Sequence, residues 1–367
     1  MAEVHGTCDK RFDAVRVALA ESLDDTDVGA SAAVFVDGEP VADLWGGYQD
    51  AKRTEPWERD TITNVFSTTK TMVGLSALIL ADRGDLDLDA PVARYWPEFA
   101  AAGKEQVLVR HLLSHTAGLP EFDPPVAVED LYDWAKATDR LARQAPRWEP
   151  GMLAGYHSVT HGFLVGEVVR RITGQSLATF FANEIATPLG ADFHLTMPAG
   201  AGLDERFAPV LAPPDAPDGD LVAAPPGDHN QDVATTAIRI SDGNSEAWRR
   251  AEILSGSGYG NARSVAAVQS VLACGGEVNG IRLLSPEGCE RAREEQYRGV
   301  DQILGRSVRY GLGYGIFDPA VGWAGWGGSI VMVDLDARMT VAYVMNQMLQ
   351  PDYRGLGIVL AAYDGLG

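Results

Sequence analysis

Ser67 and Lys70 are the first residues whose types and spacing suit covalent catalysis. They lie in the segment STTK, directly after the β-prone residues 64–66 and at the start of an apolar helix. Because residues i and i+3 share one helix face, the Lys70 amine is expected beside the Ser67 hydroxyl, where it can accept or relay the hydroxyl proton. Backbone N–H groups at a helix start also favour the negative charge of acyl transfer. The alternative is a serine N-cap followed by a solvated lysine.

Proton transfer requires a second group, because an ordinary lysine has a pKa of about 10.4 and is a poor base at neutral pH. Burial or a cationic neighbour would have to lower that pKa. Tyr156, in the segment GYHS before another apolar helix, is the candidate partner. A phenolate near Lys70 could take the Ser67 proton and return it to the leaving alkoxide. The alternative is an amphipathic core tyrosine.

A glycine-rich segment, GWGGS at 325–329, enters a β-prone run. Successive glycines carry no side chains where a strand approaches a ligand, so a backbone N–H there can form half of an oxyanion hole. The alternative is a turn or a bulge. No serine lies in G-x-S-x-G, the nucleophile elbow of the α/β-hydrolases, and that class of enzyme is therefore disfavoured.

Composition excludes two classes of partner. The chain has 30 Lys and Arg against 51 Asp and Glu, a formal net charge of −21, so its surface repels nucleic-acid phosphates and anionic lipids. We expect neither nucleic-acid nor membrane partners. The start of the sequence has no export signal, and the apolar run around Val73–Ala81 is too short to span a bilayer. Cys8, Cys274 and Cys289 suggest no disulfide set, so we expect a cytoplasmic protein.

Two histidine pairs at i, i+4 raise the alternative of a metal-dependent hydrolase. They are His111 with His115, and His157 with His161. Neither pair has the H-E-x-x-H carboxylate, and no third ligand is evident. We therefore expect no metal and no cofactor, and we interpret His115 as a structural residue.

The periodicity of apolar residues predicts strands near both ends of the chain and helices between them. Predicted strands are Ser31–Val36, Val41–Trp45 (after a turn at 37–40), Tyr310–Phe317, Ser329–Leu335 and Thr340–Asn346. Predicted helices are Arg11–Ser22, Ser67–Arg83, Leu131–Gln144, His161–Ile172, Leu177–Ala186, Ser264–Ala273, Pro286–Glu295 and Ile358–Tyr363. A stretch rich in Pro, Gly and Asp, Ala208–His229, predicts a long surface loop of the kind that borders binding sites.

This order predicts an α/β (α+β) protein with two domains. Residues 1–66 and 264–367 would form one sheet domain from both termini. Residues 67–263 would form an inserted, mostly helical domain, with the active site in the cleft between the two.

Taken together, S-x-x-K, Y-x-[N/S] and a glycine-rich strand in place of K-T-G resemble the serine β-lactamase and penicillin-binding-protein superfamily, most closely its family VIII esterases. HLLSHTAGLP at 111–120 resembles that family's LLSHTSGLP segment, and YHSVTHGFLVGEVVRRITG at 156–174 resembles its tyrosine-bearing helix. Residues 260–264 and 341–346 match later family segments. The resemblance covers about 64–346 and implies an antiparallel sheet flanked by helices.

The resemblance also implies roles for individual residues. Ser67 would be the acylated nucleophile, Lys70 and Tyr156 its proton-transfer partners, and the N–H groups of Ser67 and Ser329 the oxyanion hole. Trp326 would occupy the position of the K-T-G lysine, and Ser158 that of the Asn in Y-x-N. The substrate pocket is expected to comprise Trp326, Gly327, Gly328, Ser158 and His157.

The resulting hypothesis is a serine carboxylesterase that hydrolyses short, neutral, small-molecule esters. Because an indole cannot supply the ammonium of K-T-G, β-lactamase activity is disfavoured. The alternatives are an acyltransferase, an amide hydrolase or D-aminopeptidase, and a β-lactamase of the same family. A non-catalytic ligand sensor is the alternative from another class, and a homo-oligomer stays open.

Overall fold

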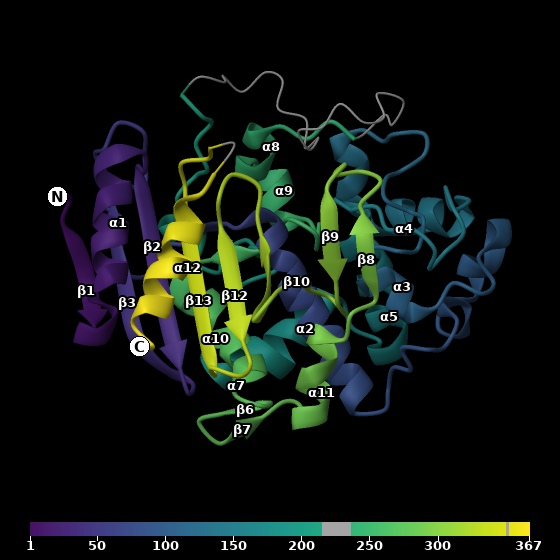
Figure 1. Ribbon diagram of the computed structural model, residues 1–367. Coiled ribbons are helices and arrows are strands. Elements are labelled where there is room, and N and C mark those ends of the chain that lie inside the picture. Colours follow the sequence, from purple (N-terminus) through teal and green to yellow (C-terminus); the bar gives the residue numbers. More distant parts are fainter. Residues whose placement is uncertain (215–235, 350–351) are drawn as a thin grey trace.

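A nine-stranded antiparallel sheet organises the computed structural model, which describes residues 1–214, 236–349 and 352–367 (Figure 1). Its strand order is β1-β3-β2-β13-β12-β11-β10-β9-β8. The strands are β1 Val4–Cys8, β2 Gly29–Val36, β3 Glu39–Gly47, β8 Tyr297–Val300, β9 Ser307–Tyr310, β10 Gly315–Phe317, β11 Ala320–Ala324, β12 Ile330–Asp334 and β13 Met339–Met345. Two small ladders pair β4 Thr63–Asn64 with β5 Tyr259–Gly260, and β6 Glu277–Val278 with β7 Ile281–Arg282.

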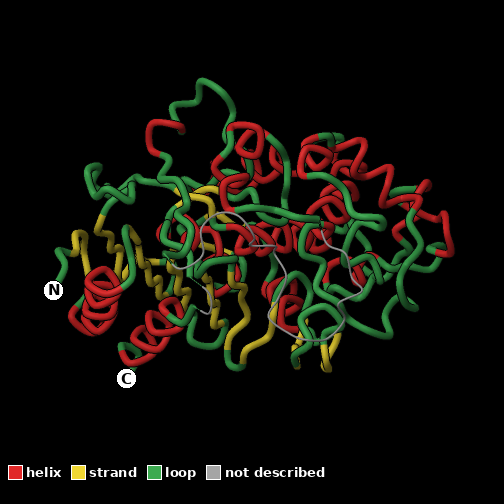
Figure 2. Tube along the Cα trace, turned by 90° about the horizontal axis from the view of Figure 1, so that it is seen from above, coloured by secondary structure: helices red, strands yellow, loops and turns green. Residues whose placement is uncertain are grey.

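Helices cover both faces of the sheet. On one face α1, Asp13–Asp25, packs beside α12, Arg354–Asp364, and the view from above shows both on the same side of the strands (Figure 2). On the other face α10, Ala262–Ala273, contacts β2 and β13, and α2, Lys70–Asp82, packs on α10. The other helices are α3 Val109–Leu113, α4 Trp134–Arg143, α5 Thr160–Thr173, α6 Leu177–Phe181, α7 Thr187–Leu189, α8 Ile240–Asn244, α9 Glu246–Arg250 and α11 Pro286–Glu290.

The predicted fold class is confirmed: a large antiparallel sheet flanked by helices. All nine strands come from 4–47 and 297–345, so the two ends of the chain build the sheet together, with β2 beside β13. The proposed domain boundaries, after 66 and before 264, stay a prediction. No helix in the described parts of the chain is both long enough and apolar enough to cross a membrane.

Most predicted elements are present, and the differences have local causes. Asp133 accepts a hydrogen bond from the Lys136 N–H as an N-cap, so α4 starts at Trp134 and not at 131. The hairpin turn has two residues, Asp37 and Gly38, both with positive φ, where we expected four.

The predicted strand at 310–317 is interrupted by a turn at 311–314, so it forms parts of β9 and β10. The predicted helix at 286–295 ends at 290 and continues as a 3₁₀ turn to 293. The sequence interpretation missed β1, β8 and β11. Of the predicted loop, 208–214 is described and hydrogen-bonds to Ile62 and Asn346, whereas 215–229 lies outside the described residues.

Helix α2 is buried along almost its whole length, because it packs against the helices α5, α6, α10 and α11. Gly74 lies against Gly313 in the turn between β9 and β10. A Cβ atom at position 74 would be 2.9 Å from the Gly313 Cα and 3.0 Å from its carbonyl oxygen. This close backbone contact fixes the helix that starts at Lys70 relative to the sheet.

We predict that Gly74→Ala lowers the free energy of unfolding by about 1–3 kcal/mol, because the added methyl group overpacks a rigid backbone contact. Gly357→Ala in α12 is the matched control, since a Cβ there meets nothing within 4 Å. Alanine has the better helix propensity, so this control should raise stability by about 0.5–1 kcal/mol. Urea unfolding measures both values, and a stabilised Gly74→Ala variant would contradict the packing argument.

Candidate active site

Ser67 is held in a strained turn between β4 and α2. A 3₁₀ turn, Phe66–Thr69, leads into the helix, and Phe66 has a positive φ of 43°. The Phe66 N–H donates to Asn64 Oδ1 at 2.8 Å, which holds this conformation. Between Thr61 and Leu80, Ser67 is the single residue that is not buried. Strained backbone that surrounding contacts hold in place is typical of functional sites.

Two polar groups, the Tyr156 hydroxyl and the Lys70 amine, meet at the Ser67 hydroxyl, as the sequence predicted. The Tyr156 hydroxyl donates to Ser67 Oγ at 2.7 Å, and Lys70 Nζ lies 3.2 Å from the same oxygen. Lys70 Nζ also donates to the carbonyl oxygens of Ser158, at 2.7 Å, and Ser255, at 3.1 Å. A neutral amine has two N–H bonds and one lone pair. In its neutral form the amine can therefore donate to the two carbonyls and direct its lone pair at Ser67, whereas the charged form donates to all three oxygens.

The surroundings of Lys70 shift its protonation equilibrium toward the neutral amine. Burial lowers the pKa of this amine, because the charged form loses its hydration, while Tyr156 and Glu121 act in the opposite direction. The Lys70 side chain is 1% exposed, and its Nζ lies 4.8 Å from the centre of the Tyr156 ring. The burial that the sequence argument required is therefore present.

Ser329 lies beside Ser67, at the end of the glycine-rich turn. Its hydroxyl donates to the Val65 carbonyl at 2.7 Å and is 2.9 Å from Thr68 Oγ1, so it contacts residues on both sides of Ser67. Ser67 lies in the first turn of its 3₁₀ helix, where backbone N–H groups have no acceptor within the helix, and Ser329 directly precedes β12. Two backbone donors near one hydroxyl have the composition of an oxyanion hole.

The glycines of the turn are required by contacts within the protein. The Gly328 N–H donates to the Gly325 carbonyl at 3.2 Å, and Gly327 has a φ of 85°. A Cβ at Gly327 would lie 2.5 Å from Met348 Cγ, and one at Gly328 would lie 1.8 Å from Asp352 Oδ2. The sequence argument attributed these glycines to close approach of a ligand, whereas they accommodate the C-terminal segment.

Trp326, in the same turn, is half-buried and packs edge-on against Phe66, with the ring centres 5.2 Å apart. Because Phe66 directly precedes Ser67, the indole lies beside the segment that carries Ser67. The pocket role of Trp326 stays a prediction.

Residues 156–158 alternate in exposure. Tyr156 and Ser158 are half-buried, and His157 between them is completely buried. His157 Nδ1 lies 2.6 Å from the Gly155 carbonyl, its Nε2 accepts from the Leu119 N–H at 3.3 Å, and burial lowers its pKa to about 4. This geometry does not support a pocket role for His157, because both ring nitrogens are already bonded to the backbone.

The histidines form a buried aromatic cluster. The ring centre of His115 lies 5.5 Å from that of His157 and 5.0 Å from that of His161, and burial lowers the pKa of all three. His111 is outside this cluster and accepts from the Leu108 N–H. Within the described ranges, no group of three or more His, Cys, Asp or Glu is arranged to hold a metal.

Sequence reasoning missed three residues near the site: Thr68, Glu121 and Ser255. Thr68 belongs to the STTK segment, but nothing local indicates that its hydroxyl meets Ser329. Glu121 directly follows HTAGLP, and burial raises its pKa to about 7. Ser255 is 185 residues from Lys70, and it contributes a backbone carbonyl, which no residue type can signal.

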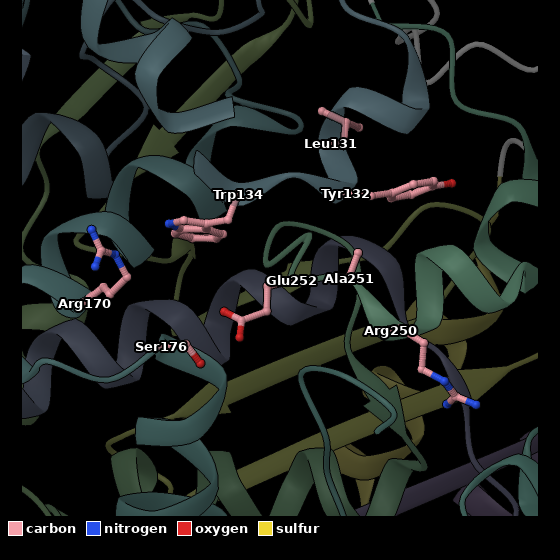
Figure 3. A pocket seen from close by; sticks show the side chains of 8 residues that line it. All are labelled: Leu131, Tyr132, Trp134, Arg170, Ser176, Arg250, Ala251 and Glu252. Carbon is pink, nitrogen blue, oxygen red and sulfur yellow. The ribbon is translucent and has the colours of Figure 1, made fainter. Parts of the chain in front are cut away.

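A separate cavity of about 320 Å³ lies between α4, α5 and residues 250–252 (Figure 3). Trp134 and Glu252 line it, and none of the predicted catalytic residues does. The Arg170 guanidinium at its edge is already paired with Glu167, at 2.7 Å. This cavity is therefore distinct from the Ser67 site.

Comparison with known proteins agrees with this geometry. A family model described as Beta-lactamase matches residues 19–363. The esterase/beta-lactamase LipL of Mycobacterium tuberculosis is 35% identical over 369 residues, which cover 95% of this chain and 84% of LipL. The chain belongs to the beta-lactamase family.

Solved structures support the same assignment. A family VIII carboxylesterase is 38% identical, with a TM-score of 0.89, 99% of this chain covered and 100% of that chain. A penicillin-binding-protein homologue from Caulobacter crescentus is 34% identical, with the same TM-score and coverage. The predicted resemblance is confirmed, and this beta-lactamase-family protein is a serine hydrolase.

We predict that Lys70 and Tyr156 act as one proton-transfer unit, because both contact the same Ser67 oxygen. Lys70→Ala and Tyr156→Phe should each lower kcat/KM by at least about a hundredfold, and the double variant should be little worse than either. Tyr310→Phe is the matched control: it removes a buried hydroxyl that contacts Asp301 and not Ser67. Steady-state kinetics of the four variants measures the coupling, and additive losses would indicate separate roles.

Proposed function

We propose that this protein is a carboxylesterase that hydrolyses short-chain neutral esters through an acyl-enzyme on Ser67. The observation that carries the proposal is the convergence of Lys70 Nζ and the Tyr156 hydroxyl on one serine oxygen, in a turn that Ser329 contacts on both sides of Ser67. The names of LipL and of the family VIII carboxylesterase support an ester as the substrate.

Acylation begins when Ser67 Oγ attacks the ester carbonyl carbon. Its proton passes to the Lys70 lone pair, directly or through the Tyr156 oxygen, since both lie within hydrogen-bond reach. The N–H groups of Ser67 and Ser329 stabilise the carbonyl oxygen as it becomes negative. When the C–O bond breaks, the same relay protonates the leaving alkoxide, and the alcohol departs.

Deacylation repeats these steps with water in place of Ser67. The neutral amine takes a proton from the attacking water, and the proton returns to Ser67 Oγ as the acid leaves. Every step uses side chains and backbone of this chain, so the proposed mechanism requires no cofactor. An alcohol or amine in place of water would give acyl transfer from the same intermediate.

The groups around the site favour a substrate without a negative charge. Lys70 is occupied by two carbonyls and Ser67, and Trp326 contributes an apolar indole with one N–H donor. A carboxylate on the substrate would therefore be desolvated without a cationic partner. The net charge of −21 adds a long-range penalty that salt screens. β-Lactam cleavage is the second candidate, because LipL is named both esterase and beta-lactamase.

Incubation with a fluorophosphonate should add one phosphonyl group, because the reagent modifies an activated serine. Intact-mass spectrometry and peptide mapping should place the adduct on Ser67. Ser67→Ala should give no adduct and lose ester hydrolysis by several orders of magnitude. Ser76→Ala is the matched control, since the hydroxyl of this buried helix serine donates to the Met72 carbonyl of its own helix.

Two outcomes would contradict the mechanism. Unchanged turnover by Ser67→Ala would exclude Ser67 as the nucleophile. Loss of activity after EDTA dialysis, with recovery on adding zinc, would favour the metal-dependent alternative at the histidine pairs.

We predict that kcat/KM for a neutral aryl acetate or butyrate exceeds that for a penicillin or cephalosporin by at least about a hundredfold. A poorly paired carboxylate costs about 1–3 kcal/mol or more, which corresponds to about tenfold to more than a hundredfold. Side-by-side kinetics at moderate ionic strength makes the comparison, with Ser67→Ala as the blank. Comparable efficiency on a β-lactam would mean that a cation reaches the substrate carboxylate.

A further inference from the structure

Arg354 is a buried cation that joins the active-site turn to the rest of the fold. It lies at the start of α12, and its side chain is 9% exposed. Its Nη2 donates to the Gly327 carbonyl at 3.1 Å and to the Gln347 carbonyl at 2.8 Å. Its Nε donates to both oxygens of Asp352, at 3.0 and 3.1 Å. One guanidinium therefore holds the glycine turn and the segment that follows β13.

The other side of the guanidinium is anchored in the sheet. Nη1 donates to Asp27, whose side chain is completely buried after α1. The same carboxylate accepts from the hydroxyls of Ser22 and Tyr343, each at 2.5 Å. Because Tyr343 belongs to β13, between β2 and β12, the Arg354 side chain is linked through Asp27 to the interior of the sheet. Two buried carboxylates balance its charge, which leaves it no role as a free cation in the cleft.

The turn fits tightly against this network. The Gly327 carbonyl also accepts from the Leu349 N–H at 3.2 Å, and the absent side chain of Gly328 leaves the space that Asp352 occupies. The next residue is Ser329, whose hydroxyl contacts Val65 and Thr68 around the nucleophile. Rotation of the Gly327 peptide would therefore move the Ser329 N–H relative to Ser67.

We propose that Arg354 is a positioning residue that fixes the 325–329 turn so that the Ser329 N–H faces the oxygen that becomes negative during acyl transfer. The inference rests on the proposed function, in which that N–H is one half of the oxyanion hole. Arginine suits the task because its planar fork bridges two carboxylates and two carbonyls at once, whereas an ammonium has three donors at a single point.

Arg354→Lys tests the proposal, because lysine keeps the charge against Asp27 and Asp352 but cannot maintain the whole set of bonds. We expect kcat to fall by at least about tenfold with KM within about twofold, since a misaligned oxyanion donor weakens the transition state more than substrate binding. Affinity for an aryl boronic acid, which forms a tetrahedral adduct on the serine, should fall by a similar factor.

Tyr363→Phe is the matched control. It removes the hydrogen bond from the Tyr363 hydroxyl, in the same helix as Arg354, to Asp334 and lowers stability, but it touches none of the groups that bind the Arg354 guanidinium. Its kcat and boronic acid affinity should equal those of the wild type. Asp352→Asn, which weakens the clamp on the guanidinium without removing it, is the second variant. It should show a smaller fall in kcat, and it decides the test if circular dichroism shows that Arg354→Lys does not fold.

The outcomes distinguish failure of the proposed esterase function from failure of the positioning role of Arg354. A wild-type enzyme without esterase activity or fluorophosphonate labelling would overturn the proposed function itself. An active wild type with unchanged kcat in folded Arg354→Lys, or with a raised KM alone, would overturn the positioning role. Loss of kcat in Tyr363→Phe equal to that in Arg354→Lys would also overturn it, because stability would then explain both.

Discussion

Burial of Lys70 removes the water that would hydrate the charged form of its amine. The site depends on the protein groups that take the place of this water. The carbonyls of Ser158 and Ser255 accept two N–H bonds from Lys70 Nζ, and Ser67 Oγ is the third neighbour. This arrangement suits an uncharged amine with its lone pair at the serine. A solvated lysine at the same position would carry a proton at neutral pH and could not act as the base.

Each of the three neighbours comes from a different part of the chain. Ser67 and Lys70 lie on one helix start, Ser158 precedes α5, and Ser255 lies in the loop between α9 and β5. The Ser255 hydroxyl accepts from the Gly162 N–H and donates to the Val159 carbonyl, both at 2.7 Å. Packing of α2 against α5 therefore determines the environment of the amine as much as the STTK motif does.

The opposite wall of the site is built by the C-terminal third of the chain. The turn that ends at Ser329 lies between β11 and β12, and the buried pair of Arg354 with Asp27 ties it to both termini. Removal of one partner from such a buried pair is costly, because the other charge is left unpaired. The two halves of the candidate oxyanion hole thus depend on contacts between segments more than 200 residues apart.

Local patterns in the sequence were sufficient for most of the elements and for the residue types at the site. The i, i+3 spacing of Ser67 and Lys70 and the GWGGS segment predicted which groups would meet, since one helix face and one turn are local properties. The start of α4 and the break between β9 and β10 were missed, although Asp133 caps the helix and Gly313, with a positive φ, lies in the turn between the two strands.

The tertiary structure decided what surrounds those residues. His157 is buried in the core, and both of its ring nitrogens are bonded to the backbone. Gly327 and Gly328 lie against other parts of the protein, where the sequence argument expected a ligand. The tertiary structure also supplied the Ser255 carbonyl and the buried Arg354. Carbonyl groups and long-range ion pairs leave no pattern along the chain, because every residue has a carbonyl and partners hundreds of residues apart meet only when the sheet assembles.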